Sequence, residues 1–586
     1  MIETLVDSFN IWGTAQTQKS KGKKAGIDNL SLHGINRLRE LILELAVRGK
    51  LVEQDAEDEP AIKLLQRIEK HKEKFIVERR IKKQKKIAEI TSAEKPHNVP
   101  KNWTWSRLQN ICTKLTDGSH NPPKNSGKGF PMLSSQNVTN GYIDFYNPTR
   151  FVTSKDFEIE NQRTLIEPND ILLTIVASLG RSAVVPENAP KFVLQRSVAV
   201  ISSPLNSRFL SMQLIAPNCT RYYDFHGKGT AQKGIYLGKL GLMPIAIPPL
   251  AEQHRIVAKV DELMALCDKL EQQQMNHIET HLLLVKALLK TLTDAKDAEA
   301  LNAAWQHLEP HFDILFTTEE SIDLLKQTIL QLAVMGKLVP QDKNDEPASK
   351  LLKKIEAEKL KLIKEGKLKK QKPLPEITED EKPFELPEGW EWIKFGLFSE
   401  FINGDRGKNY PNKSEYVSEG VAWINTGHIE PTGKLTTRDM NFITREKYDS
   451  LRSGKIERDD LVYCLRGATF GKTAFVEPYE EGAIASSLMI IRPVFKEMKH
   501  FIFLYLTSPF AKQQLFRFDN GSAQPNLSAN SVLNYYFPLP PLSEQHRIVT
   551  KVDELMALCD QLKERIVASQ EIKVKLADAV VERAVR

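Results

Sequence analysis

Two blocks of sequence each occur twice in this 586-residue chain, and this repeat constrains its architecture more than any other feature. Residues 45–69 match residues 332–356 at an offset of 287 positions. Residues 254–268 match residues 546–560 at an offset of 292, with one difference in fifteen positions. The long segments between the matched blocks share only scattered anchors, such as GTAQ and GSAQ. Because self-similarity at a fixed period indicates a duplicated structural unit, we predict two nearly constant helical frames that alternate with two variable globular domains.

The second repeated block predicts a long helix in each copy. Its apolar residues recur at alternating spacings of four and three, a heptad-like seam that suits paired helices. The pattern continues loosely over residues 251–290 and 543–585, and a helix of about forty residues is a rod of roughly 60 Å. Such a rod must bury its apolar stripe, and the duplicate helix is the obvious partner. The seam consists of Ile256, Val260, Leu263, Cys267 and Leu270 in the first copy, and of Ile548, Val552, Leu555, Cys559, Leu562 and Ile566 in the second.

A Gln-His-Arg triplet opens each long helix after a PPL segment. Polar residues that are identical in both copies at the start of a helix have two interpretations. They either cap the helix or contact a protein partner, and the sequence leaves both open. The candidate partner-binding residues are Gln253, His254, Arg255, Gln545, His546 and Arg547.

The two variable segments are predicted to be mixed α/β domains. Short apolar runs rich in β-branched residues indicate strands at 171–176, 198–202, 461–465 and 488–494, and residues 501–518 indicate a helix interrupted near Pro509. The fold class is therefore α+β, with a pseudo-two-fold tandem repeat. The predicted division is a flexible leader at 1–32, a helical frame at 33–99, a variable domain at 100–250, a central frame with a long helix at 251–386, a second variable domain at 387–541 and a C-terminal helix at 542–586.

Composition narrows the class of protein but does not identify it. The formal net charge of +7 is compatible with a polyanionic partner without requiring one. The five cysteines include no CxxC pair, so neither a disulfide framework nor a zinc site is expected. The beginning of the chain lacks the features of a signal peptide, and no uncharged apolar run is long enough to span a bilayer. We therefore expect a cytoplasmic protein.

Sequence motifs for catalysis are incomplete. GATFGKT at 467–473 has three residues between its glycines, whereas a phosphate-binding loop needs four. Asn121-Pro122-Pro123 is similar to the NPP motif of amino-methyltransferases, but Lys124 follows it in place of the aromatic residue that stacks on a flipped base. No metalloprotease motif, nucleophile elbow or convincing carboxylate pair is present. We expect no catalytic residue, no metal and no cofactor in this chain.

Loops rich in hydrogen-bond donors recur in both variable domains. Arg, Lys, Asn, Gln and Ser are the side chains that hydrogen-bond base edges and phosphates. Any single loop fits a structural role better than base reading, and it is the occurrence of such loops in both domains that favours DNA binding. The basic runs at 81–86 and 368–373 are either solvated helix faces or phosphate contacts. The candidate DNA-binding residues are Ser119, His120, Asn121, Lys124, Ser134, Ser135, Gln136, Asn137, Arg181, Gln195, Arg196, Lys228, Gln232 and Lys233 in the first domain, and Arg406, Lys408, Asn425, Thr426, His428, Arg466, Lys472, Gln524 and Asn526 in the second.

The combination of these motifs resembles the specificity (HsdS) subunits of type I restriction-modification enzymes over nearly the whole chain. The resemblance is carried by the repeated LAVxGKLVxQ blocks, the GWxW-like domain starts, GSAQPNLS at 521–528 and the repeated PPLxEQHRIVxKVDELMALCD helices. The long N-terminal frame is most similar to the IB group. The first domain departs from the pattern at Gly229–Gly234, where KGIY follows GTAQ, which weakens the transfer of roles to residues there.

This resemblance implies a function that composition alone does not show. Each variable domain would be a target recognition domain that reads one half of a split double-stranded DNA sequence. The long helices would pair antiparallel and set the unread spacer. Each frame would dock one methyltransferase (HsdM) subunit carrying S-adenosylmethionine, and restriction (HsdR) subunits using ATP and Mg²⁺ would join the complex. The chain itself would be a non-catalytic specificity subunit.

Overall fold

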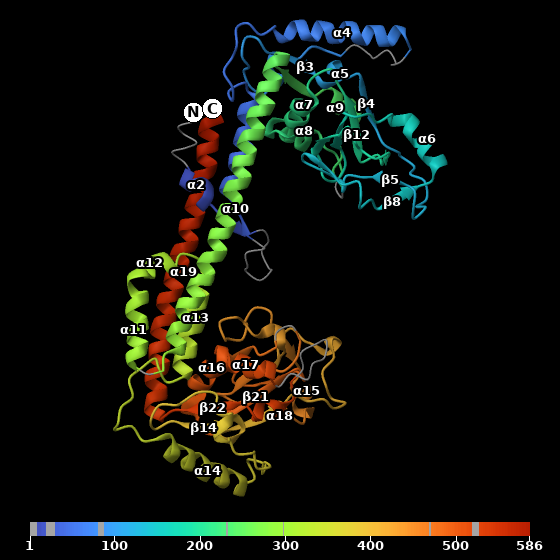
Figure 1. Cartoon of the computed structure of the whole chain (residues 1–586). Coiled ribbons are helices and arrows are strands. Elements are labelled where there is room, and N and C mark those ends of the chain that lie inside the picture. The colour runs from blue at the N-terminus through green and yellow to red at the C-terminus, as the bar shows by residue number, and fades with distance from the viewer. Residues whose placement is uncertain are drawn as a thin grey trace. The chain divides into compact units, whose positions relative to one another are not determined.

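The computed structural model describes residues 9–18, 30–79, 87–229, 232–296, 298–467, 470–517 and 527–585. It divides into two compact units (Figure 1). The first unit is Met1–His277 with Ser569–Arg586, and the second is Ile278–Ala568. Each unit contains one variable domain and one helical frame.

Two long helices contribute to both units. Helix α10 spans Leu250–Asp294 and α19 spans Leu542–Val585, which confirms the long helices predicted from the heptad-like seam. Seam residues such as Ile256 and Cys267 in α10, and Val552 in α19, are buried. The helix boundary lies inside the repeated PPL segment in each copy, where proline is compatible with the start of a helix but not with its interior.

In the first unit, helix α3 (His33–Val47) runs antiparallel to α10. Arg39, early in α3, forms ion pairs with Asp268 at 2.6 Å and with Glu271 at 2.7 Å. Gln54, which follows α3, donates a hydrogen bond to Glu252 in the first turn of α10. Going along the chain from Arg39 to Gln54, the contacted residues of α10 go backwards from Glu271 to Glu252, so the two helices are antiparallel.

Helix α3 also contacts the last turns of α19, and the two helices run parallel. Arg37 pairs with Asp578 at 2.8 Å, and Arg48 donates to the carbonyl of Val585 at 2.9 Å. Since α3 is antiparallel to α10 and parallel to α19, the long helices run antiparallel within this unit. The antiparallel arrangement that the family resemblance implied is thus confirmed here.

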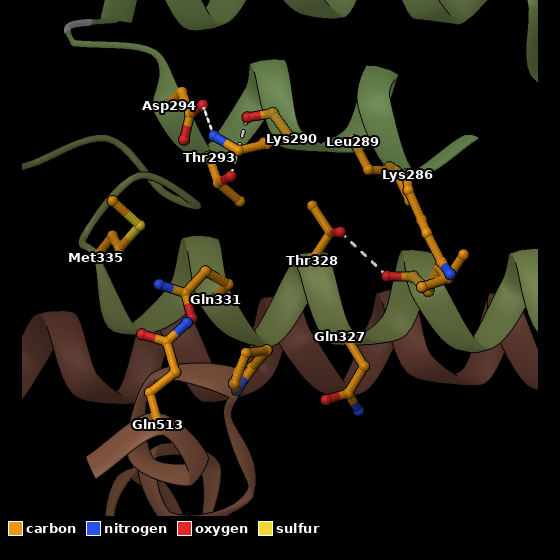
Figure 2. A pocket seen from close by; sticks show the side chains of 12 residues that line it. Lys286, Leu289, Lys290, Thr293, Asp294, Gln327, Thr328, Gln331, Met335 and Gln513 are labelled. Atoms are coloured by element: carbon orange, nitrogen blue, oxygen red, sulfur yellow. Dashed lines mark hydrogen bonds and ion pairs between the residues drawn. The ribbon is translucent and has the colours of Figure 1, made fainter. Parts of the chain in front are cut away.

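The second unit has the same arrangement with the two long helices exchanged. Helix α13 (Glu319–Val334) is antiparallel to α19, because Asp323 pairs with Lys563 at 2.9 Å and Lys326 pairs with Asp560. Figure 2 shows Thr293 and Met335 at matching ends of α10 and α13, so these two helices run in the same direction. Each frame is therefore a bundle of one short and two long helices.

The remaining frame helices are shorter. In the first unit α4 follows α3, and in the second unit α11 and α12 precede α13 while α14 follows it. These helices lie within the frames predicted at 33–99 and 251–386. The basic run at 368–373 follows the end of α14 and is not helical, so it is not a helix face, and the basic run at 81–86 lies outside the described residues. The helix bounds are α4 Ala61–Val77, α11 Ala298–Leu308, α12 Phe312–Leu315 and α14 Ala348–Lys364.

The structure differs from the flexible leader expected at 1–32 over residues 9–18 and 30–32, whereas residues 1–8 and 19–29 lie outside the described part of the chain. Phe9–Thr14 forms helix α2, and Thr17–Gln18 (β1) pairs with Leu30–Ser31 (β2). Trp12 is buried, and the amide of Gly34 donates to the carbonyl of Ala15 at 3.0 Å. The expectation rested on the basic, polar composition nearby, and it missed that one tryptophan supplies enough apolar surface to dock a short helix on α3.

The main sheets of the two variable domains have the same strand order although the sequences barely match, and the first domain has an additional two-stranded sheet of β6 and β7. In each domain, a four-stranded antiparallel sheet lies beside a three-stranded sheet containing one parallel pair, and a two-stranded sheet joins the domain's first and last strands. The sheet orders are β10-β9-β12-β4, β11-β5-β8 and β13-β3 in the first domain, and β19-β18-β21-β15, β20-β16-β17 and β22-β14 in the second. The duplication therefore includes the variable domains, whose fold persisted while their sequences diverged.

The elements of the first domain confirm its predicted strands. The runs predicted as strands at 171–176 and 198–202 correspond to β9 and β12, which are buried because neighbouring elements cover both faces of the sheet. The bounds are β3 Thr104–Arg107, α5 Leu108–Ile111, β4 Lys114–Asp117, β5 Phe130–Leu133, β6 Val138–Thr139, β7 Tyr142–Ile143, β8 Arg150–Val152, α6 Ser154–Thr164, β9 Ile171–Thr174, β10 Ser182–Val184, β11 Val193–Leu194, β12 Val198–Ser202, α7 Ser207–Ile215, α8 Pro217–His226, α9 Leu237–Gly241 and β13 Pro244–Ile247.

The second domain confirms the strand and helix predictions in the same way. The predicted interruption near Pro509 separates α16 from α17, as expected for a residue without a backbone N–H. The bounds are β14 Glu391–Lys394, β15 Ser399–Asn403, β16 Val421–Ile424, β17 Asn441–Ile443, α15 Arg445–Ser450, β18 Leu461–Cys464, β19 Thr473–Phe475, β20 Gly482–Ile484, β21 Leu488–Pro493, α16 Lys499–Thr507, α17 Pro509–Arg517, α18 Ala529–Leu533 and β22 Tyr536–Leu539.

One frame-to-domain contact differs between the copies and involves a titratable group. The ring of His97 packs edge-on against Trp105, and its Nε2 donates a hydrogen bond to the carbonyl of Val47 at 3.2 Å. Burial, followed by the positive charge of Arg48, lowers the pKa of His97 from 6.5 to about 4. The Val47 hydrogen bond and the charge of Glu44 act in the opposite direction but do not outweigh burial.

His97 should make the stability of the first unit depend on pH. Its folded-state pKa lies below its unfolded value, so this contribution to stability is complete above pH 6.5 and is lost as the pH falls towards about 4. The second copy has Phe384 at the equivalent position, packed on Trp392. We expect His97→Phe to flatten the dependence of the free energy of unfolding on pH in this window, measured by urea denaturation. The exposed His307→Phe serves as the control, and an equal slope in both variants would contradict the assignment.

Candidate nucleic-acid interface

Backbone hydrogen bonds bring together the candidate loops of the first domain. The amide of Ser119 donates to the carbonyl of Leu194 at 2.8 Å, and the amide of Arg196 donates back to Ser119 at 2.9 Å. The amide of Gln195 in turn donates to Leu133 at 2.8 Å. The loop after β4, the loop after β5 and the segment between β11 and β12 therefore meet at one end of the domain.

Two further loops join the same surface. Ile175 donates to the carbonyl of Ser197 at 2.9 Å, which places the loop between β9 and β10 beside the β11–β12 segment. The amide of Ala177 donates to the carbonyl of Lys233 at 2.9 Å and connects this loop to the described residues of the 228–234 segment, which are 228–229 and 232–234. The five loops that the sequence singled out separately thus form one continuous surface, which we call the first loop surface.

The structure divides the candidate residues of the first domain by exposure. Exposed side chains are available to a ligand, whereas buried polar groups are normally satisfied within the protein. Exposed candidates are His120, Asn121, Lys124, Gln136, Arg181, Arg196, Lys228, Gln232 and Lys233; Gln195 is half-buried, and Ser119, Ser134, Ser135 and Asn137 are buried.

The buried candidates Ser134, Ser135 and Asn137 belong to a turn that recurs in the second domain. Asn137 accepts the amide of Ser134 on its side-chain oxygen at 3.0 Å and donates its own amide to the carbonyl of Ser134 at 3.0 Å. In the second domain the Nδ1 of His428 accepts the amide of Asn425 at 3.1 Å, and the amide of His428 donates to the Asn425 carbonyl. Burial lowers the pKa of His428, which suits a neutral ring that accepts a hydrogen bond. Asn137 and His428 therefore hold the loops in shape.

The second domain gathers its candidate loops at the equivalent end. The amide of Leu465 donates to Ser487 at 2.9 Å, and the amide of Ala485 donates to Ile424 at 2.8 Å. A Cβ at Gly404 would lie 2.5 Å from the carbonyl of Ala485, so the loop after β15 also passes through this region. Residues 403–409, 424–428, 465–467, 470–472 and 485–487 form what we call the second loop surface. Arg406 and Lys408 are exposed, Asn425, Thr426, Arg466 and Lys472 are half-buried, and Gln524 and Asn526 lie outside the described residues.

Arg466 has an unusual environment on the second loop surface. Its Nε is buried and has no hydrogen-bond partner within the described part of the chain. A buried guanidinium nitrogen without an acceptor is costly, and phosphate oxygens and guanine edges are acceptors that suit its fork-shaped geometry.

Exposed aromatic residues border the first loop surface and were not predicted from the sequence. Tyr146 is 81% exposed, next to a loop in which Asp144 donates to the carbonyl of Asn137. Phe225 and Tyr236 flank residues 228–234 and are also exposed. Large apolar side chains left in water beside donor-rich loops fit contacts with thymine methyl groups or sugars. The YIDFY and KGIY stretches carried this signal, but only the fold showed that these rings are not in the core.

The Gln-His-Arg triplets also have defined environments. Gln253 is buried; its amide donates to the carbonyl of Pro248 and its oxygen accepts the amide of Asn206 at 2.9 Å. Gln545 is likewise buried and donates to Pro540 at 3.0 Å. The two glutamines are thus used inside the chain, while His254 and His546 are exposed. Arg255 pairs with Asp58 at 2.6 Å, and Arg547 pairs with Asp345 at 2.7 Å.

One groove lies between the frame helices and the variable domain of the second unit. Figure 2 shows this groove of about 440 Å³, lined by α10, α13 and the start of α17, in which Lys290 pairs with Asp294 and the hydroxyl of Thr328 donates to a backbone carbonyl. Among the described residues, no group of three His, Cys, Asp or Glu side chains is arranged to hold a metal ion. No described helix is both long and apolar enough to cross a membrane.

Two domains with the same strand order in their main sheets, each with a donor-rich loop surface and mounted on a repeated helical frame, define a modular binding protein. The family model of the type I restriction modification DNA specificity domain matches residues 100–280 and 387–572. The chain is 36% identical over 605 residues to the EcoAI type I restriction enzyme specificity subunit of Escherichia coli, covering 99% of each. It is 35% identical over 616 residues to the EcoEI specificity subunit of Escherichia coli, covering 100% of this chain and 99% of the other.

A solved structure described as "Structural basis underlying complex assembly and conformational transition of the type I R-M system" contains a similar chain. That chain is 19% identical, with a TM-score of 0.47, and the match covers 84% of this protein and 99% of the other. The protein belongs to the family of type I restriction enzyme specificity subunits, which confirms the resemblance seen in its sequence motifs. Membership of this family assigns it a role in DNA recognition.

Proposed function

We propose that the two loop surfaces read the two halves of one asymmetric, bipartite DNA target. The observation that carries this proposal is that two domains whose main sheets have the same strand order present different side chains at equivalent positions. Gln195 and Arg196 follow β11, whereas Ala485 and Ser486 occupy the corresponding place after β20. Because base edges are distinguished by the donors and acceptors that face them, different side chains on one scaffold read different bases.

Two readers that address one face of the duplex contact it about one helical turn apart, roughly 10–10.5 base pairs. The spacer between the half-sites would then go unread. Neither the bases nor the spacer length follows from the side chains alone, because a loop's geometry decides which donors reach the groove. A map of methylated adenines in the host genome supplies both half-sites and the spacer together.

Variants of the first loop surface should lower DNA affinity in a way that identifies each contact. Arg196→Ala and Lys233→Ala remove exposed cations from its centre and its rim. A lost phosphate contact weakens binding to all sequences alike and reduces the salt slope by roughly 0.9; a lost base contact costs about 1–3 kcal/mol and relaxes one position of the target. Fluorescence anisotropy of the reconstituted complex at several salt concentrations separates the two cases.

The exposed Lys155 on α6 lies outside the five loops and provides the control as Lys155→Ala. Equal DNA affinities for the three variants and the wild type would show that the first loop surface does not contribute to DNA binding. Retention of specific DNA by the complex when this chain is omitted would contradict the proposed function as a whole.

We infer that the repeated frames each dock one methyltransferase subunit, since a surface preserved twice suits two identical partners. Within the stretch shared by both copies, Leu266 and Leu558 are exposed by 55% and 60%. In the second unit Leu558 lines an apolar cavity of about 690 Å³ together with the half-exposed Trp305. Exposed apolar patches of this kind mark protein–protein contacts.

Catalysis would then be carried by the partners. The methyltransferase subunits would supply S-adenosylmethionine chemistry at adenine, and restriction subunits using ATP and Mg²⁺ would join through the complex. The specificity chain would contribute binding and orientation, and its complex would act in the cytoplasm.

A further inference from the structure

A carboxylate is buried in the first turn of each long helix. Glu252 of α10 is 1% exposed. Its Oε2 accepts the indole N–H of Trp103 at 3.0 Å, and its Oε1 accepts the side-chain amide of Gln54 at 2.6 Å. Trp103 directly precedes β3 of the recognition domain, and Gln54 lies in the frame after α3. One side chain therefore joins the long helix, the recognition domain and the frame.

The second unit repeats this carboxylate with the same two partners. Glu544 of α19 is 1% exposed and accepts Trp390 at 3.0 Å and Gln341 at 3.1 Å. The tryptophans and the frame glutamines are 287 positions apart between the copies, and the glutamates are 292 apart. The extra residues of the second domain thus fall between its tryptophan and its glutamate without altering their contact.

The turn that follows the short frame helix packs directly on the same tryptophan in both copies. Gly49 has a φ of +68°, and a Cβ there would lie 2.6 Å from Pro100 and 3.0 Å from the Trp103 ring. Gly336 has a φ of +69° and the same relation to Pro387 and its own tryptophan. Only glycine fits a left-handed conformation in such close contact, so no side chain separates the frame from the domain.

The other edge of each tryptophan reaches the interior of its recognition domain. The rings of Trp103 and Phe209 meet edge to face with centroids 6.5 Å apart, and those of Trp390 and Phe501 meet in the same way at 6.3 Å. Phe209 and Phe501 are each 1% exposed, on α7 and α16. The indole is thus held by the domain core on one side and by the carboxylate on the other.

This arrangement requires a double acceptor. Two N–H donors face the two oxygens of Glu252, and a carboxylate accepts both, whereas an amide has one acceptor oxygen and would turn its own N–H₂ towards one donor. Burial raises the pKa of Glu252 and of Glu544, and the two donated hydrogen bonds act against that rise. Because hydrogen bonds weaken steeply away from linear geometry, the pair restricts how the indole plane can turn against the helix.

We propose that Glu252 and Glu544 are positioning residues for DNA recognition: each holds its recognition domain at a set angle on the first turn of its long helix and thereby limits which spacer lengths the chain accepts. This inference rests on the proposed reading of a bipartite target. Each glutamate acts through its tryptophan and not on the DNA.

The test compares methylation by the reconstituted complex on targets whose spacer is native, one base pair longer or one base pair shorter. The wild type should prefer the native spacer. Glu252→Gln should reduce that preference roughly tenfold, the scale expected when a buried donor loses its acceptor, while the preferred bases of both half-sites stay the same. Glu544→Gln should behave alike. A merely structural role would lower all rates together and leave the spacer preference intact.

Matched controls exist on the same helices. Glu262 and Glu554 occupy equivalent positions in the two copies and are exposed, where they pair with Lys259 and Lys551. Glu262→Gln and Glu554→Gln should leave the spacer preference unchanged.

A rescue variant covers the possibility that Glu252→Gln assembles poorly. Combining Gln54→Glu with Glu252→Gln exchanges the two groups, so the amide at 252 can accept from Trp103 and donate to the carboxylate at 54. This double variant should restore assembly and the spacer preference. An assembled double variant without the preference, or a Glu252→Gln complex that discriminates spacers as well as Glu262→Gln does, overturns the positioning role. A wild-type complex without any bipartite target would instead overturn the proposed function.

Discussion

Replacing Leu558 by aspartate is expected to yield a complex that carries one methyltransferase subunit in place of two. Leu558 is 60% exposed, so the substitution removes little from the core of the chain itself. At an interface it would exchange an apolar anchor for a charge that must be desolvated. Losing a buried leucine costs roughly 2–3 kcal/mol, and burying an unpaired carboxylate adds more. We therefore expect affinity at that frame to fall by at least about a hundredfold.

The duplication makes this experiment internally controlled. Leu266→Asp changes the equivalent residue of the first frame and should remove the other methyltransferase subunit, and the double variant should bind neither. Native mass spectrometry of the reconstituted complexes counts the subunits. Ala265→Asp and Ala557→Asp add the same charge at exposed neighbouring positions that face a different direction. If the Leu558→Asp complex still bound two methyltransferase subunits, Leu558 would not be part of the docking surface.

Exchanging residues 100–250 for the corresponding domain of another specificity subunit should change one half of the recognised sequence and leave the other half intact. The first domain is closed by the pairing of β3 with β13, so both of its ends lie together and a transplanted domain meets the same frame contacts. We expect recognition of the original half-site to be lost completely, because each mismatched base pair costs about 1–3 kcal/mol and every base pair of that half-site would be mismatched. Sequencing that detects methylated adenine reports the new target.

The reciprocal exchange of residues 387–541 should alter only the other half. The two experiments together test whether the loop surfaces act independently. A change in both half-sites after a single exchange would contradict one domain per half-site. A changed spacer length with unchanged half-sites would indicate that the exchange altered the contact between the recognition domain and Glu252 or Glu544.

Much of the architecture was accessible from sequence pattern because the responsible forces are local. The heptad-like seam predicts α10 and α19 since helical periodicity places Ile256, Val260 and Cys267 on one face. Proline marks the break between α16 and α17 for an equally local reason, its missing backbone donor. The prediction of a flexible leader was wrong over residues 9–18. It rested on the average composition of the segment, whereas the burial of a single side chain, Trp12, holds these residues in place.

The candidate loops illustrate the limit of such reasoning. Donor-rich sequence selected Asn137 and Arg196 with equal weight, yet the fold buries the first in a turn and exposes the second. Exposure depends on the neighbours that a loop acquires when the domain packs. Asn137 closes a local turn with Ser134 that the rest of the domain covers, whereas the backbone of Arg196 pairs with Ser119, far away in the chain, and leaves its side chain exposed. These residues remain predictions for DNA contact, now ordered by whether a ligand can reach them.

The sequence alone determined that this protein is a duplicated frame carrying two divergent domains and that it resembles the specificity subunits, because repeats and helical periodicity are properties of the chain itself. The tertiary structure decided that the main sheets of the divergent domains share one strand order and that the separate loops of each domain form one surface. It also decided that Glu252 and Glu544 meet the same tryptophan and glutamine partners twice. These depend on contacts between residues far apart in the chain, such as Trp103 and Glu252, and such contacts exist only once the strands and helices have packed.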